Sequence, residues 1–78
     1  MENNVKFNAK QFGDNLKQAR TNKGMLAEHI ADYINISLVA LSKYENGHRV
    51  PRIDTVAKIA DCLNVPIDQL IKDCLIKE

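Results

Sequence analysis

The side chains that most often carry catalysis or bind metals are few and scattered in this sequence. Its two histidines and two cysteines show no metal-ligand spacing and no pairing between the two types: His29, His48, Cys62 and Cys74. Three aspartates recur at seven-residue steps, which suits a solvated outer helical face: Asp54, Asp61 and Asp68. There is neither a glycine-rich phosphate loop nor a nucleophile with a spaced base. We therefore expect no enzyme, no metal site, no cofactor and no small-molecule substrate.

Basic side chains offer a different chemistry, the binding of a polyanion. Lys43, His48, Arg49 and Arg52 lie within ten residues of one another, and further lysines precede them at Lys10, Lys17 and Lys23. Such charges supply the salt-dependent part of nucleic-acid affinity, although a charge cluster is often only a solvated face. The net charge of the whole chain is only +1. Residues 1–52 nevertheless carry +3 and residues 53–78 carry −2, so the charge is polarised along the chain.

Length and hydropathy limit the architecture. A chain of 78 residues predicts one domain, residues 1–78, whose stability depends on well-matched elements. No apolar run approaches the roughly 20 residues that span a bilayer, and the N-terminal residues lack the apolar stretch of a secretory signal. We expect a cytoplasmic protein with reduced cysteines and no membrane partner.

Amphipathic stripes predict five helices, and strand signals are absent. The first helix has Asn8 as its N-cap, Gln11 as the capping-box partner and Phe7 packed on Phe12, and it ends near residues 22–24. We treat residues 1–7 as an N-terminal arm. The fourth helix covers about residues 53–63, and a fifth is expected over residues 66–77. The predicted fold class is all-α.

The second and third helices are separated by an unusually short connection. The second covers about residues 26–34, and Asn35 tolerates the left-handed conformation that a tight turn requires. Ser37 can cap the third helix, which Asn46 and Gly47 can close. A connection of about three residues predicts a helix-turn-helix at about residues 26–45.

These features carry a resemblance that runs without gaps from about Phe12 to Leu70. The matching stretches are FGDNLKQAR, KGM, IADYINIS, LSKYENGHRVP and IDTVAKIADCLNVPIDQL. Together they resemble the phage repressor and Cro-like helix-turn-helix DNA-binding family, of the xenobiotic-response-element type. The resemblance implies a lambda-repressor-like domain of five helices that binds a double-stranded DNA operator as a dimer, with the third helix in the major groove. It also implies an ion pair between Arg20 and Glu45.

Carried over residue by residue, the resemblance assigns two sets of DNA contacts. The third helix would touch bases through Leu38, Val39, Ser42 and Lys43. The DNA backbone would be held by Lys23, Ala27, Asn46, His48, Arg49 and Arg52. The sequence departs from the family pattern at Leu26 and Ala27, where members commonly carry a hydroxyl cap and a glutamine.

The apolar start of the third helix leaves alternatives open. Leu38 and Val39 can read DNA by packing on thymine methyl groups, while Lys43 donates to guanine or holds a phosphate. They can instead form an exposed patch for a protein partner, as in an antirepressor or a regulator subunit. In a third interpretation, Leu38 leans onto the core and leaves only Val39 exposed.

A small DNA-binding domain gains contacts with DNA by forming a dimer. Two copies related by a two-fold axis place their reading helices about one DNA turn apart, roughly 34 Å, on a palindromic operator. We therefore expect a homodimer that functions as a transcriptional regulator, most simply a repressor. The late apolar residues of the predicted fifth helix are the candidate interface: Ile71, Cys74 and Leu75.

Overall fold

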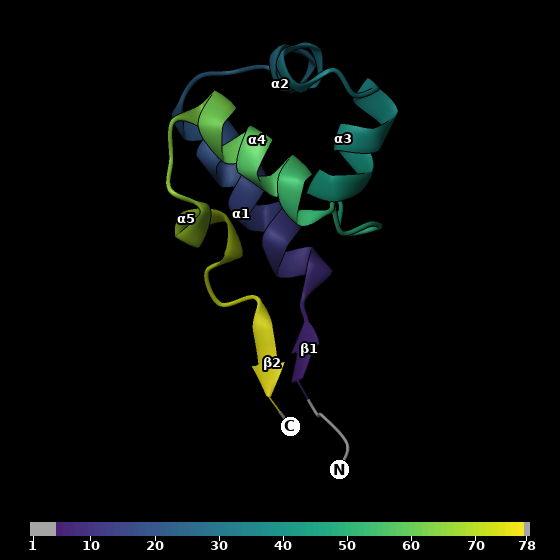
Figure 1. Ribbon diagram of the computed structural model, residues 1–78, viewed down its shortest axis with the longest axis vertical. Helices are drawn as coiled ribbons and strands as arrows, with labels where there is room; N and C mark the ends of the chain where they lie inside the picture. Colours follow the sequence, from purple (N-terminus) through teal and green to yellow (C-terminus); the bar gives the residue numbers. More distant parts are fainter. Residues whose placement is uncertain (1–4, 78) are drawn as a thin grey trace.

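The computed structural model describes residues 5–77 and has five helices and a two-stranded ribbon. The helices are α1 (Ala9–Asn22), α2 (Ala27–Ile34), α3 (Leu38–Glu45), α4 (Ile53–Leu63) and α5 (Ile67–Ile71). The ribbon consists of β1 (Val5–Phe7) and β2 (Leu75–Lys77). The ribbon projects from the end of the helical bundle opposite α2, along the longest dimension of the molecule (Figure 1).

The helices surround one apolar core. Each of the five helices contributes a fully buried side chain, and so does the segment between α5 and β2. The largest of these side chains are Phe12, Leu16, Ile30, Leu41, Ile59, Leu63, Leu70 and Cys74. Helix α1 packs against α3 and α5, while α2 packs against α3 and α4. The predicted stripes of α1 and α4 are confirmed, because Phe12, Leu16 and Ala19, together with Ile59 and Leu63, are all buried.

The turn of the helix-turn-helix forms as predicted. Asn35 ends α2 with φ 59° and ψ 50°, in the left-handed region, and Ile36 donates its backbone N–H to Ala31. The Oγ of Ser37 accepts the backbone N–H of Ala40 at 3.0 Å and so caps α3. The two helices are therefore fixed at their junction by a left-handed asparagine and a polar cap.

The prediction of a fifth helix over residues 66–77 is wrong beyond Ile71. Asp73 adopts φ 60°, which a helix cannot accommodate, and residues 75–77 form β2. The side-chain amide of Asn15 donates to the carbonyl oxygens of Leu70 and Lys72, at 2.9 Å each, and so satisfies the end of α5. A polar side chain on α1 therefore fixes where α5 stops.

The expectation that the chain contains no strands is also wrong. β1 and β2 pair antiparallel, with Val5 opposite Lys77, Lys6 opposite Ile76 and Phe7 opposite Leu75. Residues 5–7 of the expected N-terminal arm are thus strand residues, and residues 1–4 lie outside the described part of the chain. Each strand has only three residues. Such a short strand is defined by its pairing with a distant segment, and its own sequence shows no strand pattern.

The start of α1 follows the prediction in part. Asn8 Oδ1 accepts the backbone N–H of Gln11 at 3.0 Å, and the rings of Phe7 and Phe12 lie 6.1 Å apart. The reciprocal half of the capping box is absent. The backbone N–H of Asn8 donates instead to the carbonyl of Cys74, at 2.6 Å, while the Gln11 amide donates to Asn15. The ribbon thus replaces the side-chain partner that the sequence suggested.

Candidate nucleic-acid interface

One side of α3 is free of the core. Leu41, Tyr44 and Glu45 face inward and are buried, whereas Ser42 and Lys43 are exposed. Leu38 and Val39 expose 51% and 65% of their surface, so the interpretation in which Leu38 leans into the core is wrong. All four predicted base-contact residues therefore lie on one accessible surface of this helix.

A hydrogen bond orients the polar part of this surface. The side-chain amide of Asn46 donates to the Oγ of Ser42 at 3.2 Å. The Ser42 hydroxyl accepts this bond through its oxygen and still has its hydrogen to donate to another group. A donor next to the Lys43 ammonium matches the acceptor atoms N7 and O6 that guanine presents in the major groove.

The predicted ion pair between Arg20 and Glu45 is present behind α3. The Nε and Nη2 of Arg20 donate to the two carboxylate oxygens of Glu45, at 2.6 and 3.1 Å, and Nη1 donates to the carbonyl of Met25 at 3.0 Å. The two side chains are only 14% and 8% exposed. One guanidinium therefore joins the ends of α1 and α3 to the segment that leads into α2.

Gly13 lets α1 and α3 touch, and the sequence analysis did not identify it. A Cβ atom at this position would overlap the carbonyl oxygen of Glu45 and would lie 2.7 Å from that of Tyr44. The backbone at the end of α3 therefore rests directly on α1. A single glycine inside an otherwise helical pattern is a signal for such a contact, and it was available in the sequence.

The loop after α3 presents cations beside the exposed side of that helix. Gly47 adopts φ 74°, and a Cβ atom there would lie 2.8 Å from the Cα of Lys10, so the loop rests on the start of α1. His48 and Arg49 are exposed. Arg52 is also exposed, and its Nε lies 3.3 Å from a carboxylate oxygen of Asp54.

The start of α2 lacks the usual side-chain cap, as the sequence indicated. The Nδ1 of His29 accepts the backbone N–H of Leu26 at 3.2 Å and supplies half of a capping box. Ala27 is half-buried and has only its backbone N–H to offer to an anion, whereas Glu28 beside it is exposed. Lys23 lies at the end of α1 and is exposed.

The three predicted dimer-interface residues near the C-terminus differ in exposure. Cys74 is 1% exposed and belongs to the core, so its assignment to a dimer interface is wrong. Ile71 and Leu75 are exposed by 39% and 62%. Burial, with a smaller contribution from Asp73, raises the pKa of the Cys74 thiol, and burial likewise raises the pKa of the Cys62 thiol. Neither cysteine therefore resembles an activated nucleophile.

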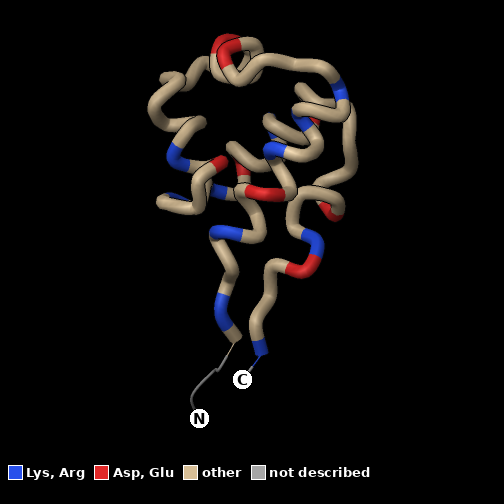
Figure 2. The backbone as a smooth tube through the Cα atoms, turned by 180° about the vertical axis from the view of Figure 1, so that it is seen from behind, with Lys and Arg blue, Asp and Glu red and all other residues tan. Residues whose placement is uncertain are grey.

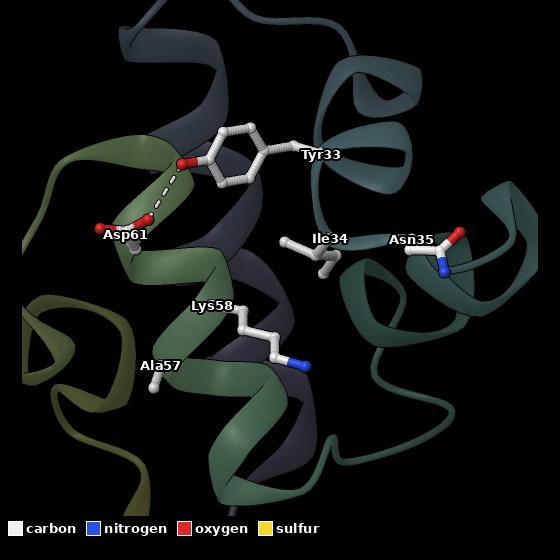
Figure 3. A pocket seen from close by; sticks show the side chains of 6 residues that line it. All are labelled: Tyr33, Ile34, Asn35, Ala57, Lys58 and Asp61. Atoms are coloured by element: carbon white, nitrogen blue, oxygen red, sulfur yellow. Dashed lines mark hydrogen bonds between the residues drawn. The ribbon is translucent and has the colours of Figure 1, made fainter.

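An open pocket of about 390 Å³ lies between α2 and α4. Tyr33 extends from α2 and its hydroxyl donates a hydrogen bond to a carboxylate oxygen of Asp61 on α4, at 3.0 Å, while Lys58 lines the pocket from the same helix as Asp61 (Figure 3). This hydrogen bond, together with the charge of Asp61, raises the pKa of Tyr33 above its ordinary 10.0. The pocket residues do not include the exposed side of α3, and the sequence analysis did not identify Tyr33 as a bridge between helices.

Within residues 5–77, no three His, Cys, Asp or Glu side chains are grouped so that they could hold a metal ion. None of the helices in this range is long and apolar enough to cross a membrane.

Comparison with known sequences decides the family. The helix-turn-helix family profile matches residues 16–70, which is most of the chain and includes both helices of the predicted motif. The chain belongs to the helix-turn-helix family. This membership agrees with the short α2–α3 connection and with the exposed side of α3.

Similar members of the helix-turn-helix family are transcriptional regulators. The SPbeta prophage-derived HTH-type transcriptional regulator YonR of Bacillus subtilis is 38% identical over 61 residues, which cover 78% of this chain and 56% of YonR. The cryptic phage CTXphi transcriptional repressor RstR of Vibrio cholerae is 46% identical over 41 residues, covering 53% of this chain and 37% of RstR. The chain thus spans little more than half the length of these curated relatives, or less.

The fold of this family member is also found among solved structures. The restriction-modification controller protein C.AhdI of Aeromonas hydrophila superposes with a TM-score of 0.76, at 26% identity, and the match covers 80% of this chain and 94% of C.AhdI. The predicted five-helix, repressor-like bundle is therefore confirmed, with the two-stranded ribbon as a small addition.

Proposed function

We propose that this protein binds double-stranded DNA sequence-specifically, as a small transcriptional regulator that functions as a repressor. The observation that carries the proposal is the exposed side of α3, where Ser42 and Lys43 lie next to a cationic loop. Membership of the helix-turn-helix family supports the placement of α3 in the major groove. The protein acts by binding and not by catalysis.

The base contacts combine apolar and polar chemistry. Leu38 and Val39 pack on the methyl groups of thymines, which is how apolar side chains distinguish T·A pairs in the major groove. Ser42 and Lys43 donate to purine acceptors. The Asn46–Ser42 hydrogen bond supports this role for Ser42, because it uses only the hydroxyl oxygen and leaves the hydroxyl hydrogen available to donate.

The phosphate contacts surround the reading helix. The proposed phosphate contacts fix the orientation of the protein on the duplex without reading its sequence. They are made by Lys23, the backbone N–H of Ala27, Asn46, His48, Arg49 and Arg52. Arg52 contributes less than Arg49, because Asp54 already neutralises part of its charge. Glu28 opposes the approach of a phosphate to the start of α2.

The working unit is a homodimer on a palindromic operator in the cytoplasm. A single α3 offers only four side chains to bases, and two copies related by a two-fold axis double that number at half-sites about one DNA turn, roughly 34 Å, apart. Ile71 and Leu75 are the remaining candidate interface residues, since both are exposed.

The test compares three variants on a pool of random duplexes. Lys43→Ala and Arg49→Ala are expected to weaken binding, and each should flatten the slope of log affinity against log salt by about one unit, because one phosphate or base contact is lost. Lys72→Ala is the matched control, since Lys72 is an exposed lysine at the end of α5, which packs against α1 and α4. Unchanged affinity and slope in Lys43→Ala and Arg49→Ala contradict the proposal.

A second candidate function has its own supporting observation. Leu38 and Val39 are 51% and 65% exposed, and an apolar pair of this kind suits a protein partner, as in an antirepressor or a regulator subunit. In that case Leu38→Asp abolishes a protein complex, and no duplex binds the wild-type protein even at low salt.

A further inference from the structure

The outer edge of β2 has a hydrogen-bonding pattern that fits a second copy of itself. The backbone N–H of Asn8 donates to the carbonyl of Cys74, while the N–H of Cys74 donates to Ile71 and does not return the bond. This single bond still fixes Asn8 and Cys74 as a hydrogen-bonded position of the antiparallel ladder. Antiparallel strands alternate between bonded and non-bonded pairs, so Lys6 and Ile76 form the next bonded pair. The N–H and C=O groups of Leu75 and Lys77 therefore point away from β1.

Two-fold pairing of β2 satisfies all of these outward groups in one register. If Leu75 of one copy lies opposite Lys77 of the other, each such pair exchanges two backbone hydrogen bonds, and the symmetry makes two pairs. Ile76 then lies on the axis, opposite Ile76 of the second copy, in a closely spaced non-bonded pair. Ile76 and Leu75 are 41% and 62% exposed in the single chain, so apolar surface is available at this edge.

Charge favours the β2 edge over the β1 edge. The equivalent two-fold register at β1 places Lys6 directly opposite Lys6 of the second copy, and like charges in directly opposed positions destabilise a sheet. At β2 the axis falls on Ile76, and each Lys77 faces a leucine. Figure 2 shows basic residues on both strands of the ribbon, so the position of each lysine relative to the axis matters.

The size and position of the ribbon also favour a second copy. An isolated two-stranded ribbon is marginally stable, and three or more strands are normally needed. The ribbon projects from the bundle, so the bundle does not block its approach to another molecule (Figure 1). A two-fold axis perpendicular to the joined sheet keeps both copies of any surface on the same side of that sheet, as a palindromic site requires.

We propose that the protein dimerises by antiparallel pairing of β2 with β2 of a second copy, which forms a four-stranded sheet in the order β1, β2, β2, β1. This inference deepens the proposed homodimer and specifies its interface, but it concerns only self-association. It also predicts that Ile71, on α5, is outside the hydrogen-bonded core of the interface.

The first test removes one outward N–H. Lys77→Pro deletes a donor that faces the second copy and leaves the bonded pairs between β1 and β2 intact, and proline is tolerated on edge strands. Lys77→Ala is the matched control, because it removes the same side chain but keeps the N–H. In sedimentation equilibrium over a range of concentrations, we expect wild type and Lys77→Ala to dimerise, and the proline variant to remain monomeric with an unchanged circular dichroism spectrum.

The second test does not depend on proline. Ile76→Cys places two thiols across the axis at a Cα separation that a disulfide can bridge, whereas Leu75→Cys leaves them two positions out of register and beyond reach. Mild oxidation is expected to cross-link Ile76→Cys and not Leu75→Cys, with the wild type, which contains Cys62 and Cys74, as baseline. A monomeric wild type, a proline variant that dimerises normally, or equal cross-linking of both cysteine variants overturns the inference.

These outcomes are separable from the test of DNA binding. A monomer that binds duplexes with the predicted salt slopes overturns the strand pairing alone. A β2-paired dimer that binds no duplex overturns the proposed function alone.

Discussion

At the scale of single residues, the structure depends on a few polar side chains that reach between helices. Arg20 holds Glu45 and the carbonyl of Met25, and Asn15 holds the end of α5. Among the described residues, every buried side-chain nitrogen and oxygen has a hydrogen-bond partner. Removing one member of such a set leaves another buried polar group without a partner, which is more costly than losing the bond itself.

The ion pair behind α3 gives the first prediction. Arg20→Ala or Glu45→Ala should each lower the free energy of unfolding by about 3 to 5 kcal/mol, because the remaining charge stays buried and unpaired. Urea denaturation measures the loss. The double variant should lose much less than the sum of the two single variants, and simple additivity would show that the two side chains do not interact.

Tyr33 gives a prediction about pH. Its hydrogen bond to Asp61 raises the pKa of the phenol above 10.0, so the stability it provides is present below pH 10 and is lost as the pH rises through the raised value. Asp61→Ala should return the pKa of Tyr33 toward 10. Absorbance titration of the phenolate measures it, with Tyr33→Phe isolating the signal of Tyr44, the chain's other tyrosine. An identical Tyr33 titration in wild type and Asp61→Ala would contradict the bridge.

The ion pair and the cap of α3 could be predicted from sequence, whereas the roles of Gly13, Asn15 and Tyr33 were missed. A cap acts over three residues, and Arg20 and Glu45 were placed by a long ungapped resemblance. Asn15 bonds to carbonyls more than fifty positions away, so its partners depend on where the chain ends up in space. No local pattern specifies such a contact.

At the scale of elements, the close packing of α1 on α3 positions the reading helix. The carbonyls of Tyr44 and Glu45 touch the backbone at Gly13, so the angle of α3 is set by contact at its C-terminal end. The opposite end is set by Ser37 and the left-handed Asn35. With both ends fixed, the side that carries Ser42 and Lys43 has a defined direction.

Gly13→Ala tests this contact. Alanine favours a helix over glycine by roughly 1 kcal/mol, yet we expect a net loss of about 1 to 3 kcal/mol, because the new methyl group meets rigid backbone atoms. Thermal unfolding measures the change, and Gln18→Ala at an exposed position on the same helix serves as the control. A stabilised Gly13→Ala variant would mean that α1 and α3 are free to separate.

The helices were easier to predict than the strands because the pattern that marks a helix is local in the sequence. α1 to α4 bury stripes with a period that is visible in the sequence, and their ends carry asparagine, serine or glycine. The apolar stripe of α5 continues through Cys74 and Leu75, which suggested a longer helix. In the structure Cys74 enters the core from the segment between α5 and β2, and Leu75 lies on the ribbon opposite Phe7.

At the scale of the whole molecule, three features are joined in sequence and in space. The exposed side of α3 leads into the loop that carries His48 and Arg49, and Gly47 brings this loop onto the start of α1 at Lys10. The ribbon continues from the start of α1 and supplies the proposed pairing surface (Figure 1). A reading surface and a pairing surface on one small bundle are what a two-fold DNA reader needs.

The most direct test of the account is selection of duplexes by the wild-type protein from a pool of random sequences, at moderate salt, followed by sequencing of the bound fraction. We predict enrichment of a two-fold symmetric motif with half-sites about one helical turn apart, and with thymine and guanine positions that lose their preference in Val39→Ala and Lys43→Ala respectively. A bound fraction with the same sequence composition as the starting pool would contradict the claim that α3 reads DNA.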